Sequence, residues 1–379
     1  MGKKILVTGS NGFIAKNLIF NLKNAGYDEI FCYNHNSTEA ELDEYLSKAD
    51  FIFHLAGVNR PKENSEFFEG NAGLTQKIVS KLEEAKRQVP ILLSSSIQAG
   101  LDNPYGASKR AAEEAVFTYG KEFDTPMYVY RLPNVFGKWS RPNYNSAVAT
   151  FCNNIARDLP ITVNDPKSIL HLVYIDDVVD QFIRCLEKGI RFPAGEFVTF
   201  PDFLVYETTV GKVADTVRSF RESRKTLSVV DMGDELGKKL YSTYLSFLPE
   251  DDFSYPLEMH EDNRGSFTEF LRTKEHGQVS VNISHPGITK GEHWHNSKNE
   301  KFLVVKGRGL IRFRKLGEEE IIEYKVSGDK LEVVDIPTGY THSIVNIGDE
   351  DMVTVMWANE AFDPEKPDTY FEKVDNKEQ

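Results

Sequence analysis

The segment ILVTGSNGFIAKNL, residues 5–18, decides the fold of the N-terminal part of the chain. A short apolar run leads into a turn that holds Gly9 and Gly12, and Ala15 follows where a helix would begin. Glycines let the backbone approach a pyrophosphate closely, and the free N–H groups at a helix start stabilise its charge. The segment therefore predicts a strand, a phosphate-binding loop and a helix, in that order.

Four further apolar runs continue this pattern outward from the first strand, at residues 29–34, 50–57, 90–96 and 126–137. Amphipathic helical stretches separate them. Apolar strands that alternate with helices are typical of a parallel sheet covered on both faces. We therefore expect a doubly wound α/β domain of the Rossmann type, with a small, mostly helical part over residues 145–245 that shapes a substrate cleft.

The C-terminal third of the chain has a different pattern. Prolines and acidic residues at 246–255 indicate a junction, and from Gly265 to Trp357 apolar and polar residues alternate between glycine turns, as in KFLVVKGRGLIRFRKLGEEEIIEYKV at 301–326. This alternation predicts an all-β barrel of the jelly-roll type. The 379 residues thus divide into a predicted α/β domain, 1–245, and a predicted β-barrel domain, 246–379.

Composition limits the function classes. The 58 acidic residues outnumber the 45 basic ones, which gives a formal net charge of -13 and argues against binding of nucleic acid or an anionic membrane. The chain has three cysteines, at 32, 152 and 185, too far apart for a disulfide framework, and lacks the apolar run of about 20 residues that a membrane span needs. We expect a cytoplasmic protein.

The stretch SSSIQAGLDNPYGASK, residues 94–109, points to chemistry. Tyr105 and Lys109 lie four residues apart, on one face of a predicted helix, and a serine run precedes them. A carbonyl group that receives a hydride must also gain a proton. A tyrosine can donate it, a lysine can lower the tyrosine pKa, and a serine hydroxyl can orient the carbonyl group. The spacing predicts a reductase site.

The end of the second predicted strand bears on the choice of dinucleotide. Enzymes that use NAD usually place an acidic residue there, to hold the ribose hydroxyls. Here the sequence reads Tyr33-Asn34-His35-Asn36, and nothing in it would repel a 2′-phosphate. We therefore expect NADP(H) rather than NAD(H).

Residues 1–245 resemble the extended short-chain dehydrogenase/reductase superfamily. Its recurring segments are similar to HLAG (54–57), Asn71, RLPNVFG (131–137) and LVYIDDV (172–178). The resemblance implies that Ser96 is the catalytic hydroxyl beside Tyr105 and Lys109. It also implies a set of cofactor-binding residues, namely Gly9, Asn11, Gly12, Phe13, Ile14, His35, Leu55, Ala56, Gly57, Asn71, Tyr105 and Lys109.

Two positions after Ser96 narrow the reaction type. A 4,6-dehydratase of this superfamily would carry acidic residues there, whereas this chain has Ile97 and Gln98, which favours net reduction or epimerisation. A nucleotide-sugar diphosphate needs cationic and polar partners. The candidate residues in this half are Arg131, Asn134, Lys138 and Arg141.

The barrel part holds a predicted metal site. Within GITKGEHWHNSKNEKFLVVKG, residues 287–307, His293 and His295 share a strand face and Glu300 follows, while His342 lies in the later run IPTGYTHSIVN. Three imidazoles and a carboxylate suit zinc, iron, manganese or nickel, with zinc favoured. The spacing is similar to the two motifs of the cupin family, except that Leu331 stands where a motif glycine is expected.

A further resemblance suggests a different role for the same histidine. DNRGSFTEF (262–270) and the run around His293 are similar to the deoxysugar 3,5-epimerases, which implies a base at His293, a phosphate or oxyanion partner and catalytic role at Lys290, and substrate contacts at Arg264 and Glu269. A histidine bound to metal cannot freely abstract a proton. Either the metal is structural or polarising and another group is the base, or His293 is the base. We favour the metal.

Segments spread over nearly the whole chain, HLAGVNRP (54–61), SSSIQA (94–99), YSTYLSFLP (241–249) and TGYTH (338–342), carry a further resemblance. Over its full length the chain resembles the bifunctional capsular polysaccharide enzymes that form UDP-2-acetamido-2,6-dideoxy-L-talose, a precursor of UDP-N-acetyl-L-fucosamine. The resemblance implies that the cupin inverts C3 of a UDP-4-keto-6-deoxy-HexNAc and that the reductase domain reduces the C4 ketone with NADPH. In one alternative the cupin is a ketoisomerase or a sugar-binding lid. In a non-enzyme alternative the chain is an NADP(H)-responsive binding protein whose cupin mediates dimerisation. We expect a homodimer.

Overall fold

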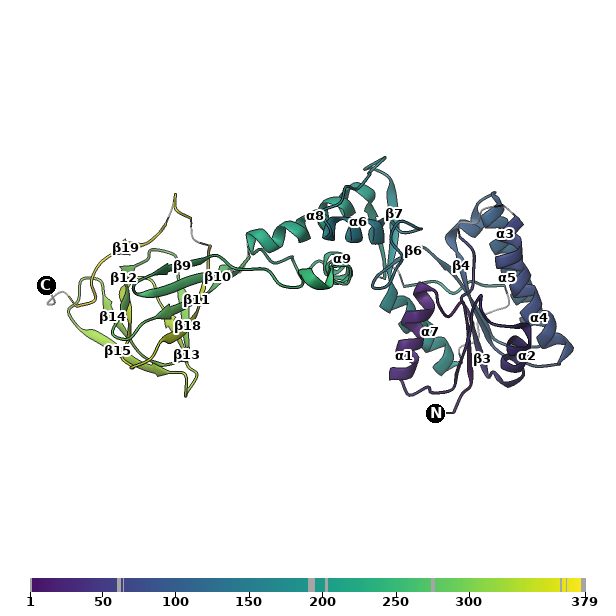
Figure 1. Cartoon of the computed structure of the whole chain (residues 1–379), viewed down its shortest axis with the longest axis horizontal. Coiled ribbons are helices and arrows are strands. Elements are labelled where there is room, and N and C mark those ends of the chain that lie inside the picture. Colours follow the sequence, from purple (N-terminus) through teal and green to yellow (C-terminus); the bar gives the residue numbers. More distant parts are fainter. Residues whose placement is uncertain are drawn as a thin grey trace. The chain divides into compact units, whose positions relative to one another are not determined.

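The chain folds into two compact units (Figure 1). A computed structural model describes residues 2–59, 63, 65–189, 195–201, 204–273, 277–361, 363–365 and 367–375. The first unit, here the Rossmann unit, comprises Met1–Ser219 and Met232–Pro249. The second, here the barrel unit, comprises Phe220–Asp231 and Glu250–Gln379.

A five-stranded sheet of order β2-β1-β3-β4-β5 forms the centre of the Rossmann unit, and all of its strand pairs are parallel. The strands are short because each ends where the chain turns into a helix. Their bounds are β1 Ile5–Thr8, β2 Ile30–Tyr33, β3 Phe51–His54, β4 Ile91–Ser96 and β5 Met127–Leu132.

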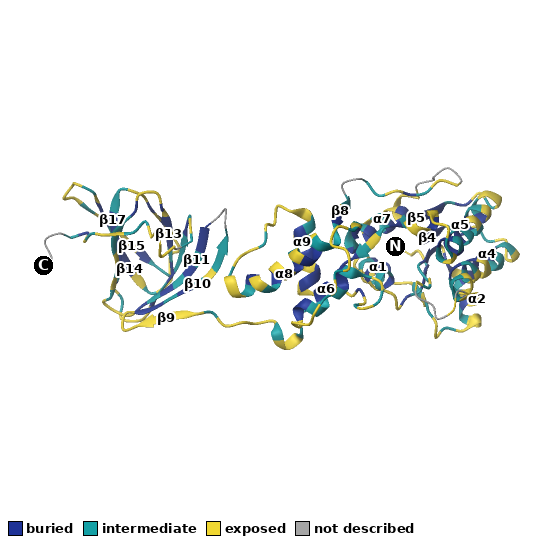
Figure 2. Ribbon diagram, turned by 90° about the horizontal axis from the view of Figure 1, so that it is seen from above, coloured by how far each residue is buried: buried dark blue, intermediate teal, exposed yellow. Residues whose placement is uncertain are grey.

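Helices cover both faces of this sheet, as Figures 1 and 2 show. Alternate residues of β1 enter opposite cores: Ile5 and Val7 pack with the helices α1 and α7, and Leu6 packs with α2, α4 and α5. Burial of both faces explains why the strands are continuously apolar. The helices are α1 Phe13–Asn24, α2 Glu39–Lys48, α4 Leu74–Glu84, α5 Pro104–Glu122 and α7 Ile175–Lys188.

The remaining elements of this half form a second, smaller sheet with helices, and the end of α8 from Phe220 on belongs to the barrel unit. A small sheet of order β6-β7-β8 pairs β6 with β7 in parallel and β7 with β8 antiparallel. These elements are β6 Asn134–Phe136, β7 Ile169–Tyr174, β8 Val205–Thr209, α6 Ala147–Ala156, α8 Val210–Thr226 and α9 Glu235–Leu245. Short helical turns lie at α3 Ser65–Phe67, η1 Phe68–Gly73 and η2 Ile97–Gly100, and a further one, η4 Glu250–Asp252, belongs to the barrel unit.

Two antiparallel sheets pack face to face in the barrel unit, with orders β16-β13-β18-β11-β10-β9 and β15-β14-β17-β12-β19. An apolar core of Phe302, Ile311, Phe313 and their neighbours fills one part of the space between them. The strands are β9 Met259–Asp262, β10 Gly265–Thr273, β11 Gly277–Ser284, β12 Thr289–Trp294, β13 Glu300–Lys306, β14 Arg308–Lys315, β15 Ile321–Ser327, β16 Val333–Ile336, β17 Tyr340–Asn346, β18 Met352–Ala358 and β19 Tyr370–Phe371.

The fold class predicted from the sequence is confirmed in both halves: a parallel, doubly covered sheet comes first, and antiparallel sheets follow. In the described part of the chain, none of the helices combines the length and the apolar character that a bilayer crossing requires.

Candidate functional sites

The turn between β1 and α1 has the geometry of a phosphate-binding loop. Gly9 has a φ of +65°, and a Cβ atom there would lie 2.7 Å from the Cα atom of Ala56, so a side chain is excluded. Gly12 is the N-cap of α1, and no side chain caps the helix there. The first N–H groups of α1 are therefore open to an anion.

This loop opens into a cavity of about 1040 Å³ in the Rossmann unit. Most of the predicted cofactor residues line it, together with the three residues of the predicted reductase site: Gly9, Asn11, Gly12, Phe13, Ile14, Leu55, Gly57, Ser96, Tyr105 and Lys109. The predicted phosphate loop and the predicted proton-donor residues thus line one cavity, the arrangement that hydride transfer requires.

Tyr105 projects from the first turn of α5, whose N-cap Asn103 accepts a hydrogen bond from the N–H of Gly106 at 2.8 Å. The Tyr105 hydroxyl donates to Oδ1 of Asn59 at 3.0 Å. Burial raises the pKa of the Tyr105 phenol, while a hydrogen bond with Ser96 lowers it. The phenol is therefore protonated at neutral pH, which is the form that can donate a proton.

Lys109 is buried one turn further along α5, and its Nζ donates to the carbonyl oxygen of Ser94 at 3.3 Å. Burial lowers the pKa of Lys109 to about 8, and the charge of Glu113 opposes that shift. A lysine that titrates this close to neutrality can both hold a positive charge and exchange a proton.

Three of the predicted cofactor residues do not line the cavity. His35 is exposed after β2, and Ala56 lies behind Gly9. Asn71 is buried: its Oδ1 accepts from the N–H of Val58 at 2.9 Å, and its Nδ2 donates to Oγ of Ser108 at 3.0 Å. Asn71 therefore ties the loop after β3 to helix α5.

Only two of the four predicted diphosphate ligands of this half line the cavity. Asn134 and Arg141 line the cavity, and the Arg141 guanidinium lies 4.9 Å from the Tyr144 ring centroid. Lys138, which does not line the cavity, pairs with Asp176 at 2.5 Å. Arg131 is absent from the lining as well, because it forms a two-point ion pair with the buried carboxylate of Glu113.

In the barrel unit the four predicted metal ligands meet. One ligand atom from each of His293, His295, Glu300 and His342 lies within 4.8 Å of the others. Oε2 of Glu300 is 3.5 Å from Nε2 of His295 and 3.4 Å from Nε2 of His342. These three atoms are buried and lack a hydrogen-bond partner in the described structure. Orphaned, convergent donors of this kind fit a divalent metal.

The ionisation of the cluster also suits a metal. Burial opposes ionisation of Glu300, yet the close imidazoles of His295 and His342 hold its pKa below the usual range. Burial and the nearby His342 lower the pKa of His293 to about 4. A carboxylate beside a neutral imidazole is the ligand form of both groups.

A bulge that the sequence did not reveal brings His293 into place. The register between β12 and β17 shifts between Gly291 and His293, and both Gly291 (φ 100°) and Glu292 (φ 59°) have left-handed backbones. His293 then pairs directly with His342 on β17. Glycine at 291 is required, because a Cβ atom there would lie 2.8 Å from the carbonyl oxygen of His342.

The predicted substrate residues of the barrel unit lie near its β9–β10 edge. Lys290 donates to Oδ1 of Asn282 at 2.6 Å and to the carbonyl oxygen of Ile283 at 2.9 Å, and burial lowers its pKa. Arg264 pairs with Asp262 at 2.5 Å.

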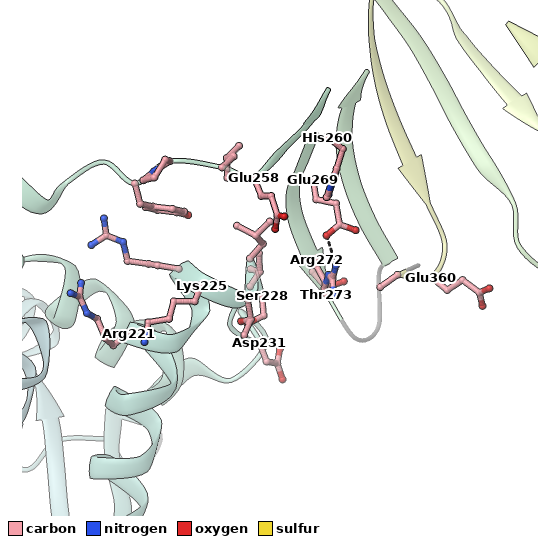
Figure 3. Close-up of a pocket in the computed structure, with 18 of the residues that line it drawn as sticks. Arg221, Lys225, Ser228, Asp231, Glu258, His260, Glu269, Arg272, Thr273 and Glu360 are labelled. Carbon is pink, nitrogen blue, oxygen red and sulfur yellow. Dashed lines mark hydrogen bonds and ion pairs between the residues drawn. The ribbon is translucent and has the colours of Figure 1, made fainter. Parts of the chain in front are cut away.

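Glu269 pairs with Arg272 in a second cavity, of about 1140 Å³, which Figure 3 shows. Its described lining residues include neither the phosphate-binding loop and reductase residues nor the proposed metal ligands. Arg221 and Arg224 both pair with Asp252, at 2.7 and 2.9 Å. Among the described lining residues the formal charges nearly cancel, so size alone does not make it an anion site.

Sequence reasoning missed two residues that contact these sites. Asn59, the partner of the Tyr105 hydroxyl, lies in the run that follows HLAG, but an asparagine there gives no sign of its contact 46 residues away. Asp368 contacts His295 from 73 residues away, and no local pattern connects them.

Comparison with known proteins agrees with both halves. Residues 5–198 match the NAD dependent epimerase/dehydratase family, and residues 260–370 match the polysaccharide biosynthesis C-terminal domain. The chain is 49% identical to a UDP-2-acetamido-2,6-beta-L-arabino-hexul-4-ose reductase from Pseudomonas aeruginosa, over 97% of this chain and 98% of that protein.

Solved structures extend the likeness. The crystal structure of the capsular polysaccharide assembling protein CapF from Staphylococcus aureus is 52% identical, with a TM-score of 0.91 over 98% of this chain and 100% of that one. A UDP-glucose 4-epimerase from Thermotoga maritima, 18% identical with a TM-score of 0.54, covers 64% of this chain and 98% of its own, and shares the fold alone. The chain therefore belongs to the NAD-dependent epimerase/dehydratase family, among the two-domain capsular polysaccharide enzymes that include CapF.

Proposed function

We propose that the chain is a bifunctional nucleotide-sugar enzyme. The barrel unit would invert C3 of a UDP-4-keto-6-deoxy-HexNAc, and the Rossmann unit would then reduce the C4 ketone to give UDP-2-acetamido-2,6-dideoxy-L-talose. The observation that carries the reductase part is the shared cavity of the Gly9 loop and the residues Ser96, Tyr105 and Lys109. The name of the Pseudomonas aeruginosa relative, a reductase of a UDP-linked 4-ulose, supports the substrate class.

In the Rossmann unit the residues divide the work of a carbonyl reduction. Bound NADPH would supply the hydride. Tyr105 would donate its phenolic proton to the ketone oxygen, after exchanging its hydrogen bond with Asn59 for one with the substrate. Ser96 would orient the carbonyl group, and the Lys109 ammonium would lower the pKa of the tyrosine as it gives up the proton.

The choice of NADPH over NADH rests on the end of β2. Asn34 there donates to Oγ of Ser10 at 3.3 Å, and no carboxylate stands among residues 33–36 to repel a 2′-phosphate. An Asn36→Asp variant should weaken NADPH binding far more than NADH binding. Equal losses for both dinucleotides would contradict the assignment.

The interior of the barrel supports a polar ligand. On β11 the buried residues are polar, Gln278, Ser280, Asn282 and Ser284, whereas the intervening valines and isoleucine are half-exposed. This reverses the usual order, and a buried polar row is costly unless it is hydrogen-bonded. The hydroxyl oxygen of Ser284 has no partner among the described groups. The hydroxyl groups of a sugar ring would supply hydrogen-bond partners for these buried polar side chains.

The polar row and Glu300 of the metal cluster lie on the same face of one sheet. Ala358 on β18 pairs with Gln278 on one side and with Glu300 on the other, so the three side chains point in one direction. We propose that His293, His295, Glu300 and His342 hold a zinc ion. The metal would supply positive charge beside the sugar. Lys290, hydrogen-bonded to Asn282 of the same row, is a candidate partner for negative charge that develops on the substrate.

The chemistry connects the two units through one functional group. A C4 ketone acidifies the proton on C3, because the resulting carbanion is delocalised onto the ketone oxygen. After inversion at C3, the same ketone is the hydride acceptor at Tyr105. The two activities are therefore consecutive steps on one ketone.

A single experiment tests both steps. The protein is mixed with NADPH and a UDP-4-keto-6-deoxy-HexNAc in D2O, and cofactor absorbance and the NMR signal at C3 are followed together. We expect NADPH oxidation together with deuterium at C3. Oxidation without deuterium would contradict the epimerase assignment, and the absence of NADPH oxidation would contradict the reductase assignment.

A further inference from the structure

The loop that follows β12 is held by a carboxylate far away in the sequence. Asp368 accepts hydrogen bonds from three consecutive backbone N–H groups, those of Asn296, Ser297 and Lys298, at 3.1, 2.9 and 2.9 Å. The hydroxyl of Ser297 adds a fourth at 3.2 Å. Four donors on one carboxylate fix the path of the loop between the metal-site residues His295 and Glu300.

The backbone of Asp368 contacts the metal site directly. Its carbonyl oxygen lies 2.6 Å from Nδ1 of His295, so Nδ1–H donates to it and the lone pair of the ring is on Nε2. That Nε2 atom is the one that faces Glu300, at 3.5 Å. Asp368 has a left-handed backbone (φ 35°), and its carbonyl group and carboxylate engage the same loop. One residue thus sets both the tautomer of a ligand and the loop that carries it.

The same C-terminal segment also holds the other end of the ligand strand. The N–H of Glu372 donates to the carbonyl oxygen of Glu292 at 2.9 Å, and the N–H of Val374 donates to Oε2 of Glu292 at 2.6 Å. Glu292 is the left-handed residue of the bulge that precedes His293. A strained, non-glycine conformation persists only where neighbours determine it, and here both contacts come from residues 372–374.

The segment is itself anchored to the barrel. Arg314 on β14 is buried, and its guanidinium donates to the carbonyl oxygens of Val374 and Lys373 at 2.8 and 2.9 Å and to the carboxylate of Glu372 at 2.7 Å. The hydroxyl of Thr341, next to the ligand His342, donates to the carbonyl oxygen of Glu372. The contacts to Asp368 and Glu292 therefore come from a fixed segment.

We propose that residues 368–374 form an outer clasp that presets the metal site, and that Asp368 is the positioning residue for His295. The inference rests on the proposed metal site. Outer-shell groups that orient a ligating histidine typically change metal affinity by about 10 to 100-fold when they are removed. Residues 368–374 supply none of the four proposed metal ligands and affect the site only through these contacts. A substitution in this segment therefore tests how the ligands are positioned without removing a ligand.

The test compares full-length variants by zinc competition against a chromophoric chelator. Asp368→Ala keeps the main-chain carbonyl group that contacts His295 but removes the carboxylate that holds residues 296–298, so we expect the apparent Kd for Zn²⁺ to rise about 10-fold. Asp368→Asn should have a smaller effect, because an amide oxygen can keep part of the loop contacts. Asp363→Asn is the matched control, since this carboxylate of the C-terminal segment accepts from the N–H of Glu365 within its own turn, and it should leave the Kd unchanged.

A spectroscopic measurement separates positioning from general destabilisation. With Co²⁺ in place of Zn²⁺, a reoriented His295 should shift the visible absorption bands of Asp368→Ala and Asp368→Asn. Partial unfolding would lower the band intensity without moving the bands. Binding of NADPH to the Rossmann unit should be the same in all variants.

The outcomes distinguish the two proposals. If the wild-type protein does not bind Zn²⁺ or Co²⁺, the metal site itself is wrong. If the wild type binds and both Asp368 variants keep its Kd and spectrum, the clasp is wrong. If Asp368→Ala does not fold, Asp368→Asn decides: a raised Kd with shifted bands supports the clasp, and an unchanged Kd or unshifted bands overturn it.

Discussion

Glu113 accepts two hydrogen bonds from the guanidinium of Arg131, from Nε at 2.9 Å and from Nη2 at 2.7 Å, one helical turn away from Lys109. The hydroxyl of Ser95 adds a third contact at 2.5 Å. The same carboxylate raises the pKa of Lys109, against the larger effect of burial that lowers it to about 8. Glu113 therefore connects its ion pair with half-buried Arg131 to the pKa of Lys109 in the proposed reductase site.

We expect the reduction rate to fall as the pH rises above about 8. The protonated fraction of Lys109 is high below its pKa and declines above it, and reduction consumes a proton at Tyr105. Glu113→Gln removes a negative charge beside Lys109, which should lower its pKa further and move the alkaline limb to lower pH. Profiles of kcat against pH for the two proteins measure this. If kcat falls at the same alkaline pH in the wild type and in Glu113→Gln, deprotonation of Lys109 is not the cause of that fall.

Tyr105→Phe should reduce NADPH oxidation by about 10² to 10⁴-fold, the usual contribution of a general acid. Deuterium exchange at C3 should persist, because that step belongs to the barrel unit. Absorbance and NMR on one sample report both. A parallel loss of exchange would mean that inversion at C3 also depends on the Rossmann unit.

His295→Ala should abolish stoichiometric metal binding and destabilise the barrel unit. A ligand that binds only the folded state contributes about 2.7 kcal/mol at one hundred times its Kd, and the variant loses that contribution. Metal analysis and thermal unfolding with and without a chelator measure it. His285→Ala is the control, because exposed His285 pairs with Asp351 outside the cluster. Full metal occupancy in His295→Ala would refute the ligand assignment.

His54 should make the Rossmann unit sensitive to acid. It is buried between the hydroxyls of Thr8 and Thr75, at 2.7 and 2.8 Å, and burial together with the charge of Lys109 lowers its pKa to about 3. The unfolded chain binds a proton near pH 6.5 and the folded chain does not. Stability is therefore lost as the pH falls from about 6.5 toward 3, by up to about 1.4 kcal/mol per pH unit.

Denaturant midpoints of wild type and His54→Gln between pH 4.5 and 7 test this. The variant loses packing, so its absolute stability is lower at every pH, but the histidine part of its pH dependence should disappear. Carboxylates contribute equally to both proteins and cancel in the difference of slopes. Identical slopes would show that His54 does not account for the acid sensitivity.

The predictable parts of these sites are those encoded locally. The Gly9 turn and the spacing of Tyr105 and Lys109 each lie within a single loop or helix, so the local sequence indicates their arrangement. His293 and His295 were expected on one strand face, but β12 ends at Trp294, so His295 lies just beyond the strand. Glu300 and His342 could be added because the spacing of the four residues is similar to the two cupin motifs, although the two residues lie on strands of different sheets.

The parts that could not be predicted depend on distant partners. Arg131 was a candidate ligand for a diphosphate, but Glu113 lies on a helix that packs against the same sheet and pairs with it. The left-handed conformation of Glu292 follows no glycine signal and is held by residues 372–374. The preference for NADPH, the identity of the metal and the homodimer remain predictions.

The chain passes from the Rossmann unit into the barrel unit, back, and into the barrel unit again, which limits how chimaeras of two relatives can be joined. Phe220–Asp231 belongs to the barrel unit, although Met232–Pro249, which follows it, belongs to the Rossmann unit. Residues 227–229 of this segment pair with the end of β10 like a short strand. The N–H of Arg272 donates to the carbonyl oxygen of Leu227, and the N–H of Val229 donates to the carbonyl oxygen of Arg272. A chimaera joined at one point near residue 246 would give β10 a neighbour from the wrong parent. Exchange of the whole barrel unit between relatives therefore needs three crossovers, after residues 219, 231 and 249, with residues 220–231 carried along as a separate insert.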